Sequence, residues 1–75
     1  MELPLEQLKP GQGAVVINID TDKALKGRLR QFGLVPGTRI TCRYCNPWGD
    51  VTALELRGTV LAMRTCDLAH IRVRR

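Results

Sequence analysis

Hydrophobic residues in this chain of 75 residues fall mostly in short runs that alternate with polar positions, a pattern typical of β-strands. The run from Ala14 to Ile19 is rich in β-branched residues and lies between a Pro-Gly turn and an acidic segment. Similar runs follow, separated by turns that contain Gly or Pro. The sequence therefore predicts five short strands, at residues 14–19, 38–45, 53–56, 59–63 and 71–73.

The segment after the first predicted strand has the spacing of an amphipathic helix that ends at about Phe32. Asp20, Thr21 and Asp22 offer capping oxygens and negative charge at its start. Apolar residues then recur at i, i+4 and i+7, which places Leu25, Leu29 and Phe32 in one stripe. A second, very short helical turn is expected at residues 66–70, before the last strand.

Glycine and proline mark where the helix ends and where the next strand begins. Gly33 occupies the position at which a left-handed residue closes a Schellman motif, and Leu34 is the apolar residue expected to pack back on the last turn. Pro36 and Gly37 fit the two central positions of a type II turn. The residues expected to have structural roles are Leu25, Leu29, Gly33, Leu34, Pro36, Gly37 and Gly58.

Residue alternation in the second predicted strand assigns one face to the core and the other to solvent. Ile40, Cys42 and Tyr44 share the predicted core face, while Arg39 and Arg43 share the opposite face. Strands this short, without repeated helices to cover a parallel sheet, favour a small, mostly antiparallel β-barrel with one short helix. Residues 1–75 are expected to form a single domain of this mainly β class.

Composition and charge indicate in which cellular compartment such a domain is expected. No apolar run approaches the roughly 18–20 residues that a membrane span needs, and the acidic start does not have the features of a signal peptide. Three cysteines, an odd number, fit a reducing compartment better than a disulfide-stapled secreted fold. We therefore expect a cytoplasmic protein with no direct membrane insertion, either a monomer or a weak homodimer.

The net charge of +5 raises the alternative of nucleic-acid binding, because phosphate neutralisation needs clustered Lys and Arg. The basic residues are scattered along this chain and favour a plain solvated surface, so no nucleic-acid partner is expected. A basic nucleic-acid-binding barrel remains a rival hypothesis. It would use Arg39, Arg43, Arg72 and Arg74.

Several motifs along the whole chain resemble the ferrous-iron transport protein A (FeoA) family. They are Leu8–Gly11, Arg28-Leu29, Gly33–Gly37, Gly49-Asp50, Arg57-Gly58, Arg64 and Ile71–Val73. Their order and spacing carry the resemblance, although Val51 stands where the family commonly has Pro. The resemblance implies an SH3-like barrel. It also implies an accessory or regulatory protein of bacterial ferrous-iron uptake that binds the cytosolic part of FeoB, a membrane transporter with a GTPase domain.

The resemblance leaves a regulatory alternative open. A related barrel is the C-terminal domain of metal-dependent repressors, where it would belong to a transition-metal sensor. A chain that starts with its own Met1 and contains no helix-turn-helix favours the transport accessory over the repressor domain.

Four side chains have the number and local spacing of a Cys3His zinc site, namely Cys42, Cys45, Cys66 and His70. Residues i and i+3 of one strand point to opposite faces, so Cys42 and Cys45 are not expected to share a metal unless the chain bends between them. We expect no metal site and no firmly implied cofactor, with iron or zinc as the metals that such a site would hold. Catalysis is not expected either, because the single His has no assembled nucleophile and base around it.

Trp48, the only Trp, lies in a predicted turn between Pro47 and Gly49. One interpretation makes it a lid on the open end of the barrel. The other makes it an interface anchor, since Trp is enriched among binding hot spots. Both interpretations predict a partly buried side chain. The residues expected to contact a partner are Pro47, Trp48, Arg39 and Arg43.

Overall fold

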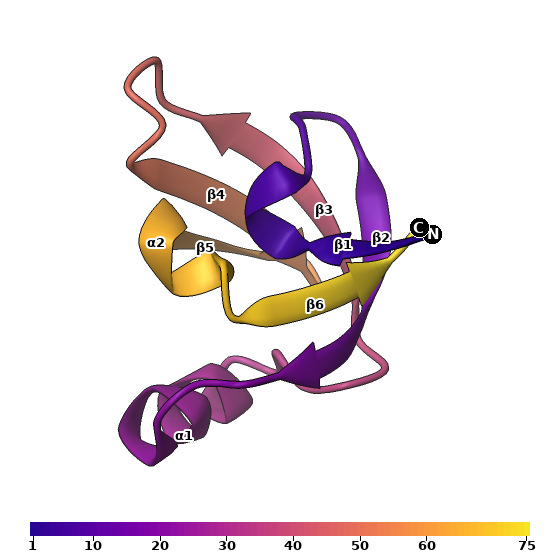
Figure 1. Cartoon of the computed structure of the whole chain (residues 1–75), viewed down its shortest axis with the longest axis vertical. Helices are drawn as coiled ribbons and strands as arrows, with labels where there is room; N and C mark the ends of the chain where they lie inside the picture. The colour runs from indigo at the N-terminus through magenta and orange to yellow at the C-terminus, as the bar shows by residue number, and fades with distance from the viewer.

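The computed structural model describes residues 1–75 as one antiparallel sheet of six strands that curls into a small barrel (Figure 1). The sheet order is β1-β6-β2-β3-β4-β5, so β1 and β5 form its two edges. The elements are β1 (Glu2–Pro4), the 3-10 helix η1 (Leu5–Gln7), β2 (Gly13–Ile19), α1 (Lys23–Gln31), β3 (Arg39–Cys45), β4 (Val51–Leu56), β5 (Thr59–Arg64), α2 (Thr65–Leu68) and β6 (Ile71–Arg74).

The fold class predicted from the sequence is confirmed, but the sheet has one strand more than expected. The extra strand is β1, which pairs with β6 through Leu3 and Val73. It escaped notice because three residues, one of them Pro, are too few to show an alternating pattern. The same pairing brings the two termini together, with the Arg75 amide donating to the Met1 carbonyl at 3.0 Å. Neither α1 nor α2 has the length and apolar character that a membrane-crossing helix requires.

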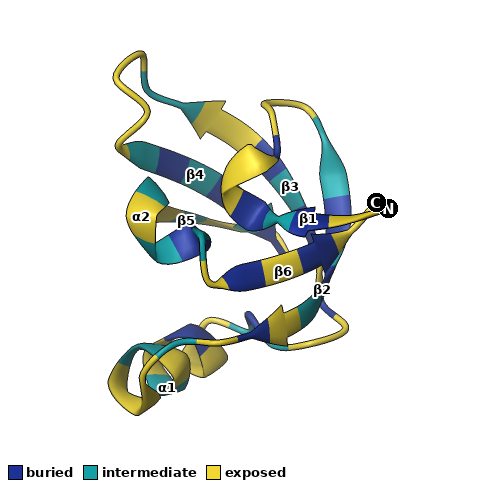
Figure 2. Cartoon of the chain, in the orientation of Figure 1, coloured by how far each residue is buried: buried dark blue, intermediate teal, exposed yellow.

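A single core of 16 buried residues fills the barrel. Figure 2 shows the alternation that builds it along β6, where buried Ile71 and Val73 alternate with exposed Arg72 and Arg74. β4 alternates in the same way, with Leu54 and Leu56 buried. The strands thus place every second side chain in the core and leave the intervening ones on the outer face.

Both ends of α1 follow the predicted capping chemistry. The Asp22 carboxylate accepts a hydrogen bond from the Leu25 amide at 2.8 Å, which makes Asp22 the N-cap. At the other end, Gly33 has φ of +86° and the Leu34 amide donates to the Leu29 carbonyl at 2.9 Å. This is the Schellman arrangement, and it buries Leu34 completely.

The apolar stripe of α1 is only partly buried, contrary to the expectation from its spacing. Leu29 is buried and Leu25 is half-buried, but Phe32 is 47% exposed. Phe32 is the C-cap residue, one position beyond the last residue of α1. Its ring therefore lies at the rim of the core instead of within it.

A tight turn fastens the end of α1 to the sheet. The Thr38 amide donates to the Val35 carbonyl at 3.0 Å, and Gly37 has φ of +95°, as the predicted type II turn requires. The buried Thr38 hydroxyl donates to the Gly33 carbonyl at 2.8 Å, and the Gly37 amide donates to the Val16 carbonyl at 2.7 Å. Helix end, turn and β2 are therefore joined by backbone and side-chain hydrogen bonds.

A β-bulge in β3 changes which side chains face the core. Cys42 pairs with Leu54 and Tyr44 with Ala53, so Arg43 has no partner on β4. The extra residue reverses the alternation beyond it, and Tyr44 is 53% exposed instead of facing the core as predicted. Without the bulge, the strict alternation of period two would have kept Tyr44 inside.

Candidate functional site

The turn between β3 and β4 projects Trp48 into solvent. Asn46 organises this turn: its side-chain oxygen accepts from the Asp50 amide at 3.0 Å, and its side-chain amide bonds the Asp50 carboxylate. The Gly49 amide also donates to the Asn46 carbonyl at 2.9 Å. The Trp48 side chain is 84% exposed at the tip of this hydrogen-bonded turn.

The exposure of Trp48 rules out one of its two interpretations. A lid on the barrel would bury most of the indole against core residues, and Trp48 belongs to no part of the core cluster. The lid interpretation is therefore wrong, as is the expectation that Trp48 is partly buried. The reason is that the hydrogen bonds among Asn46, Gly49 and Asp50 close a turn that carries Trp48 at its tip, away from the core.

The arginines expected at a partner surface lie in different surroundings. Arg43, at the bulge, pairs with Glu55 at 3.0 Å on the outer face of the sheet. Arg39 lies opposite Val15 on β2, and Arg74 lies opposite Val15 from the other side. Neither Arg39 nor Arg74 forms an ion pair. The structure thus separates Arg43 from a small outer-face group that contains Arg39, Arg72 and Arg74.

The bulge also overturns the predicted orientation of Cys45. Cys45 pairs with buried Thr52, two residues from the Leu54 that pairs with Cys42, so both thiols point to the core face. The Thr52 hydroxyl contacts the Cys45 sulfur at 3.8 Å and the Thr65 hydroxyl at 3.0 Å. Cys45 is therefore half-buried, not outside as predicted.

The four candidate metal ligands nevertheless do not come together at one site. Cys66 and His70 are exposed on and after α2, and no three His, Cys, Asp or Glu side chains of the chain are placed to share a metal ion. Burial raises the pKa of the Cys42 thiol, and the nearby Cys45 raises it further. Cys42 accordingly has the surroundings of a packed thiol instead of a thiolate ligand.

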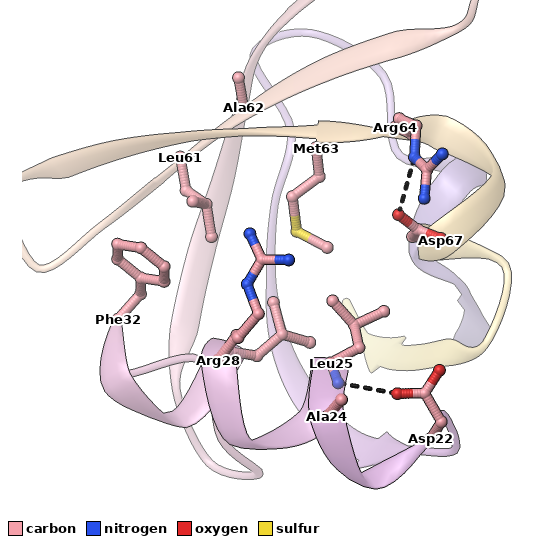
Figure 3. Close-up of a pocket in the computed structure, with 11 residues that line it drawn as sticks. Asp22, Ala24, Leu25, Arg28, Phe32, Leu61, Ala62, Met63, Arg64 and Asp67 are labelled. Carbon is pink, nitrogen blue, oxygen red and sulfur yellow. Dashed lines mark hydrogen bonds and ion pairs between the residues drawn. The ribbon is translucent and has the colours of Figure 1, made fainter.

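A groove that the sequence analysis did not predict lies between α1 and β5 (Figure 3). Its volume is about 500 Å³. It is lined by Asp22, Ala24, Leu25, Arg28, Leu29, Phe32, Leu61, Ala62, Met63, Arg64 and Asp67. The one available signal was the end of the helical stripe, because an apolar stripe that reaches past the last helical turn need not be fully covered by the sheet.

Comparison with known proteins adds the family. The family model for the FeoA domain matches residues 3–75, which is almost the whole chain. This chain belongs to the FeoA family. An Fe(2+) transport protein A of Campylobacter jejuni is 27% identical over 71 residues, covering 95% of this chain and 96% of that protein. The match therefore spans two proteins of nearly equal length.

Solved structures of other proteins share the barrel. The FeoA protein of Chlorobium tepidum superposes with a TM-score of 0.92 at 30% identity, covering 96% of this chain and 69% of that one. A manganese-dependent transcriptional repressor superposes with a TM-score of 0.87 at 12% identity, over 97% of this chain and 41% of the repressor. The second likeness shows the fold alone. The SH3-like barrel expected for this FeoA-family chain is confirmed.

Proposed function

We propose that this FeoA-family protein is an accessory protein of bacterial ferrous-iron uptake that acts in the cytoplasm by binding the cytosolic part of the FeoB transporter. The family match over residues 3–75 and the Fe(2+) transport protein A of similar length support the link to iron transport. The single observation that carries the binding role is the 84% exposed Trp48 at the tip of the β3–β4 turn.

An exposed Trp on an ordered turn has the properties of an interface anchor. A Trp side chain buries on the order of 150–250 Å² when it enters a pocket, and Trp is enriched among binding hot spots. The hydrogen bonds from Asn46 to Asp50 and Gly49 hold the turn before any partner arrives. Few additional groups of the turn need to become ordered on binding. The free-energy cost of ordering is therefore small compared with the gain from burying the indole.

The two arginines assigned to the partner surface differ in what they contribute. Arg43 is already paired with Glu55, and exposed pairs of this kind are worth about 0–1 kcal/mol. Arg39 has no ion-pair partner and stands on the outer face of β3. We expect Arg39 to act as a rim charge that raises the association rate, and Arg43 to contribute little.

Replacing Trp48 tests this proposal. Trp48→Ala should weaken binding to the cytosolic part of FeoB at least about thirtyfold, since truncating a central aromatic anchor commonly costs about 2 kcal/mol or more. Isothermal titration calorimetry measures the affinity. Thermal unfolding of the same sample should be nearly unchanged, because the side chain lies outside the core.

Arg39→Ala is the comparison variant, because it also removes an exposed side chain but one that is expected to act as a rim charge and not as the anchor. It should slow association and flatten the salt dependence while leaving the dissociation rate almost unchanged. A folded Trp48→Ala variant with wild-type affinity would show that Trp48 is not the anchor.

A further inference from the structure

Strand β5 presents an edge of the sheet that no other strand covers. β5 pairs only with β4, and the hairpin between them turns through Arg57 and Gly58, which both have positive φ. In a two-residue hairpin the flanking pair, here Leu56 and Thr59, exchanges hydrogen bonds, and hydrogen-bonded pairs then alternate along the ladder. The backbone groups of Val60 and Ala62 and the amide of Arg64 therefore point away from β4, toward the open edge, whereas the Arg64 carbonyl belongs to the N-cap of α2.

This edge has few of the features that natural sheets use to prevent pairing with other chains. Such features include proline, bulges and charged side chains. The ladder between β4 and β5 runs without a register shift from Val51 to Leu56, and β5 contains no proline. Val60 and Ala62 are apolar and exposed, and the first charge on the edge is Arg64 at its end. The sequence of β5 therefore does not prevent an extended segment from pairing with this edge.

The groove between α1 and β5 lies directly beside this edge. Four consecutive β5 residues, 61–64, line it. Successive side chains of a strand point to opposite faces, so a lining of consecutive residues includes the strand's backbone as well as its side chains. Leu61, Met63, Leu25 and Phe32 supply apolar walls of the groove. The groove thus offers apolar contact and unpaired backbone groups in one place.

Arg28 is the one charged lining residue of the groove that is neither paired nor engaged in capping, because Arg64 pairs with Asp67 and Asp22 caps α1. Its side chain rises from α1 toward β5 and ends between Leu61 and Met63 (Figure 3). Arg28 forms no ion pair and no side-chain hydrogen bond, whereas Arg64 at the end of the groove is paired with Asp67 at 3.4 Å. An unpaired guanidinium between apolar side chains is suited to bind a carboxylate, which it can contact through two parallel hydrogen bonds.

We propose that the groove binds an extended peptide segment of a partner protein. The segment adds a strand to the edge of β5, places apolar side chains against Leu61 and Met63, and directs one carboxylate to Arg28. This mode of recognition combines main-chain hydrogen bonds with pockets for alternate side chains. The groove adjoins α1, at the end of the molecule opposite the Trp48 turn, so the inference goes beyond the proposed function (Figure 1). It does not depend on which protein supplies the segment.

A second copy of this chain is a poor occupant of the groove. Its exposed edge β5 has the sequence TVLAMR, which contains no carboxylate, and its other edge, β1, has Glu2 but is only three residues long and ends in Pro4. Pairing of two β5 edges would bring Arg64 of each copy toward the arginine-bearing groove of the other. Like charges placed together oppose such a pairing, and an acidic segment of a different protein does not meet this repulsion.

A pair of synthetic peptides tests the proposal without using the transporter. Each is capped at both ends, about eight residues long like an ordinary strand, and alternates Val with Thr around one central residue, Glu in the first and Lys in the second. The Glu peptide should bind the wild-type protein and slow amide hydrogen exchange at Val60, Ala62 and Arg64, as measured by NMR. The Lys peptide should bind at least about tenfold more weakly.

Substitutions in β5 distinguish binding by strand addition from binding through side-chain contacts alone. Ala62→Pro removes an amide that points away from β4, and an edge strand tolerates proline at such a position. The variant should bind the Glu peptide at least about tenfold more weakly than the wild type does. Ala62→Thr keeps the amide and introduces a residue that favours β-strands, so this variant should bind the Glu peptide as tightly as the wild type does. Thermal unfolding of both variants checks that the barrel is intact.

A charge reversal keeps the test decisive even if Ala62→Pro fails to fold. Arg28 is exposed, so Arg28→Glu should fold normally and should now prefer the Lys peptide to the Glu peptide. Equal affinity for both peptides in the wild type, unchanged exchange at the β5 amides, or self-association of the wild type through β5 would each overturn the proposal. Absence of binding to FeoB would count against the proposed function alone.

Discussion

At the scale of single residues, Gly33 takes part both in the end of α1 and in contacts with segments that follow it in the fold. Its positive φ lets the Leu34 amide return to the Leu29 carbonyl, and its own carbonyl accepts the Thr38 hydroxyl at 2.8 Å. A Cβ at this position would also lie 3.4 Å from Cδ of Arg57, in the β4–β5 turn. One residue thus sets the helix end and anchors the type II turn, and it lies next to the side chain of a distant hairpin.

Replacing Gly33 should therefore destabilise the protein. Gly33→Ala places an L side chain at φ of +86°, which costs roughly 1–2 kcal/mol. Gly27→Ala is the matched control, because Gly27 lies inside α1 with no atom within 4 Å of an added Cβ. That change should stabilise the protein by up to about 1 kcal/mol. Urea unfolding measures both, and a Gly33→Ala variant as stable as the wild type would contradict the cap.

At the scale of elements, the bulge in β3 decides the surroundings of the cysteines. It turns Tyr44 outward and brings Cys45 to the same face as Cys42. Cys45 then rests against Thr52, whose hydroxyl also contacts Thr65 at the start of α2. The bulge therefore links β3 to α2 through side chains that strict alternation would have kept on opposite faces.

The thiols should differ in reactivity in the order that this arrangement sets. Cys66 is exposed and should be alkylated first by iodoacetamide, half-buried Cys45 should follow, and buried Cys42 should react last. The raised pKa of Cys42 also leaves less thiolate at neutral pH, which slows its reaction further. Mass spectrometry of the native protein gives the order, and equal rates for Cys42 and Cys66 would contradict it.

The elements that depend on local chemistry were predictable from the sequence. Capping by Asp22, the Gly33 helix end and the turn at Pro36 and Gly37 all follow from side-chain and backbone preferences within a few residues. The strand β1 and the bulge at Arg43 were not, because both exist only through pairing with segments distant in sequence. The groove was missed for the same reason: its two walls, α1 and β5, are about thirty residues apart in the chain.

At the scale of the whole molecule, the small barrel separates its two candidate contact surfaces. The β3–β4 turn with Trp48 lies at one end and α1 with the groove lies at the other (Figure 1). The core between them consists of 16 buried residues; Leu29 and Met63 of that core also line the groove, but Trp48 and Arg28 lie outside it. Substitutions such as Trp48→Ala and Arg28→Glu can therefore change binding at one end without disturbing the fold that carries the other.

The most direct test of the central claim is calorimetric titration of the wild-type protein into the cytosolic part of FeoB from the same organism. The account predicts saturable binding at a defined stoichiometry, with a negative heat-capacity change from burial of Trp48. The salt dependence should be shallow, because the single rim charge Arg39 contributes far less than the many contacts of a phosphate-binding surface. No heat of binding between two folded partners, across a range of temperatures, would contradict the account.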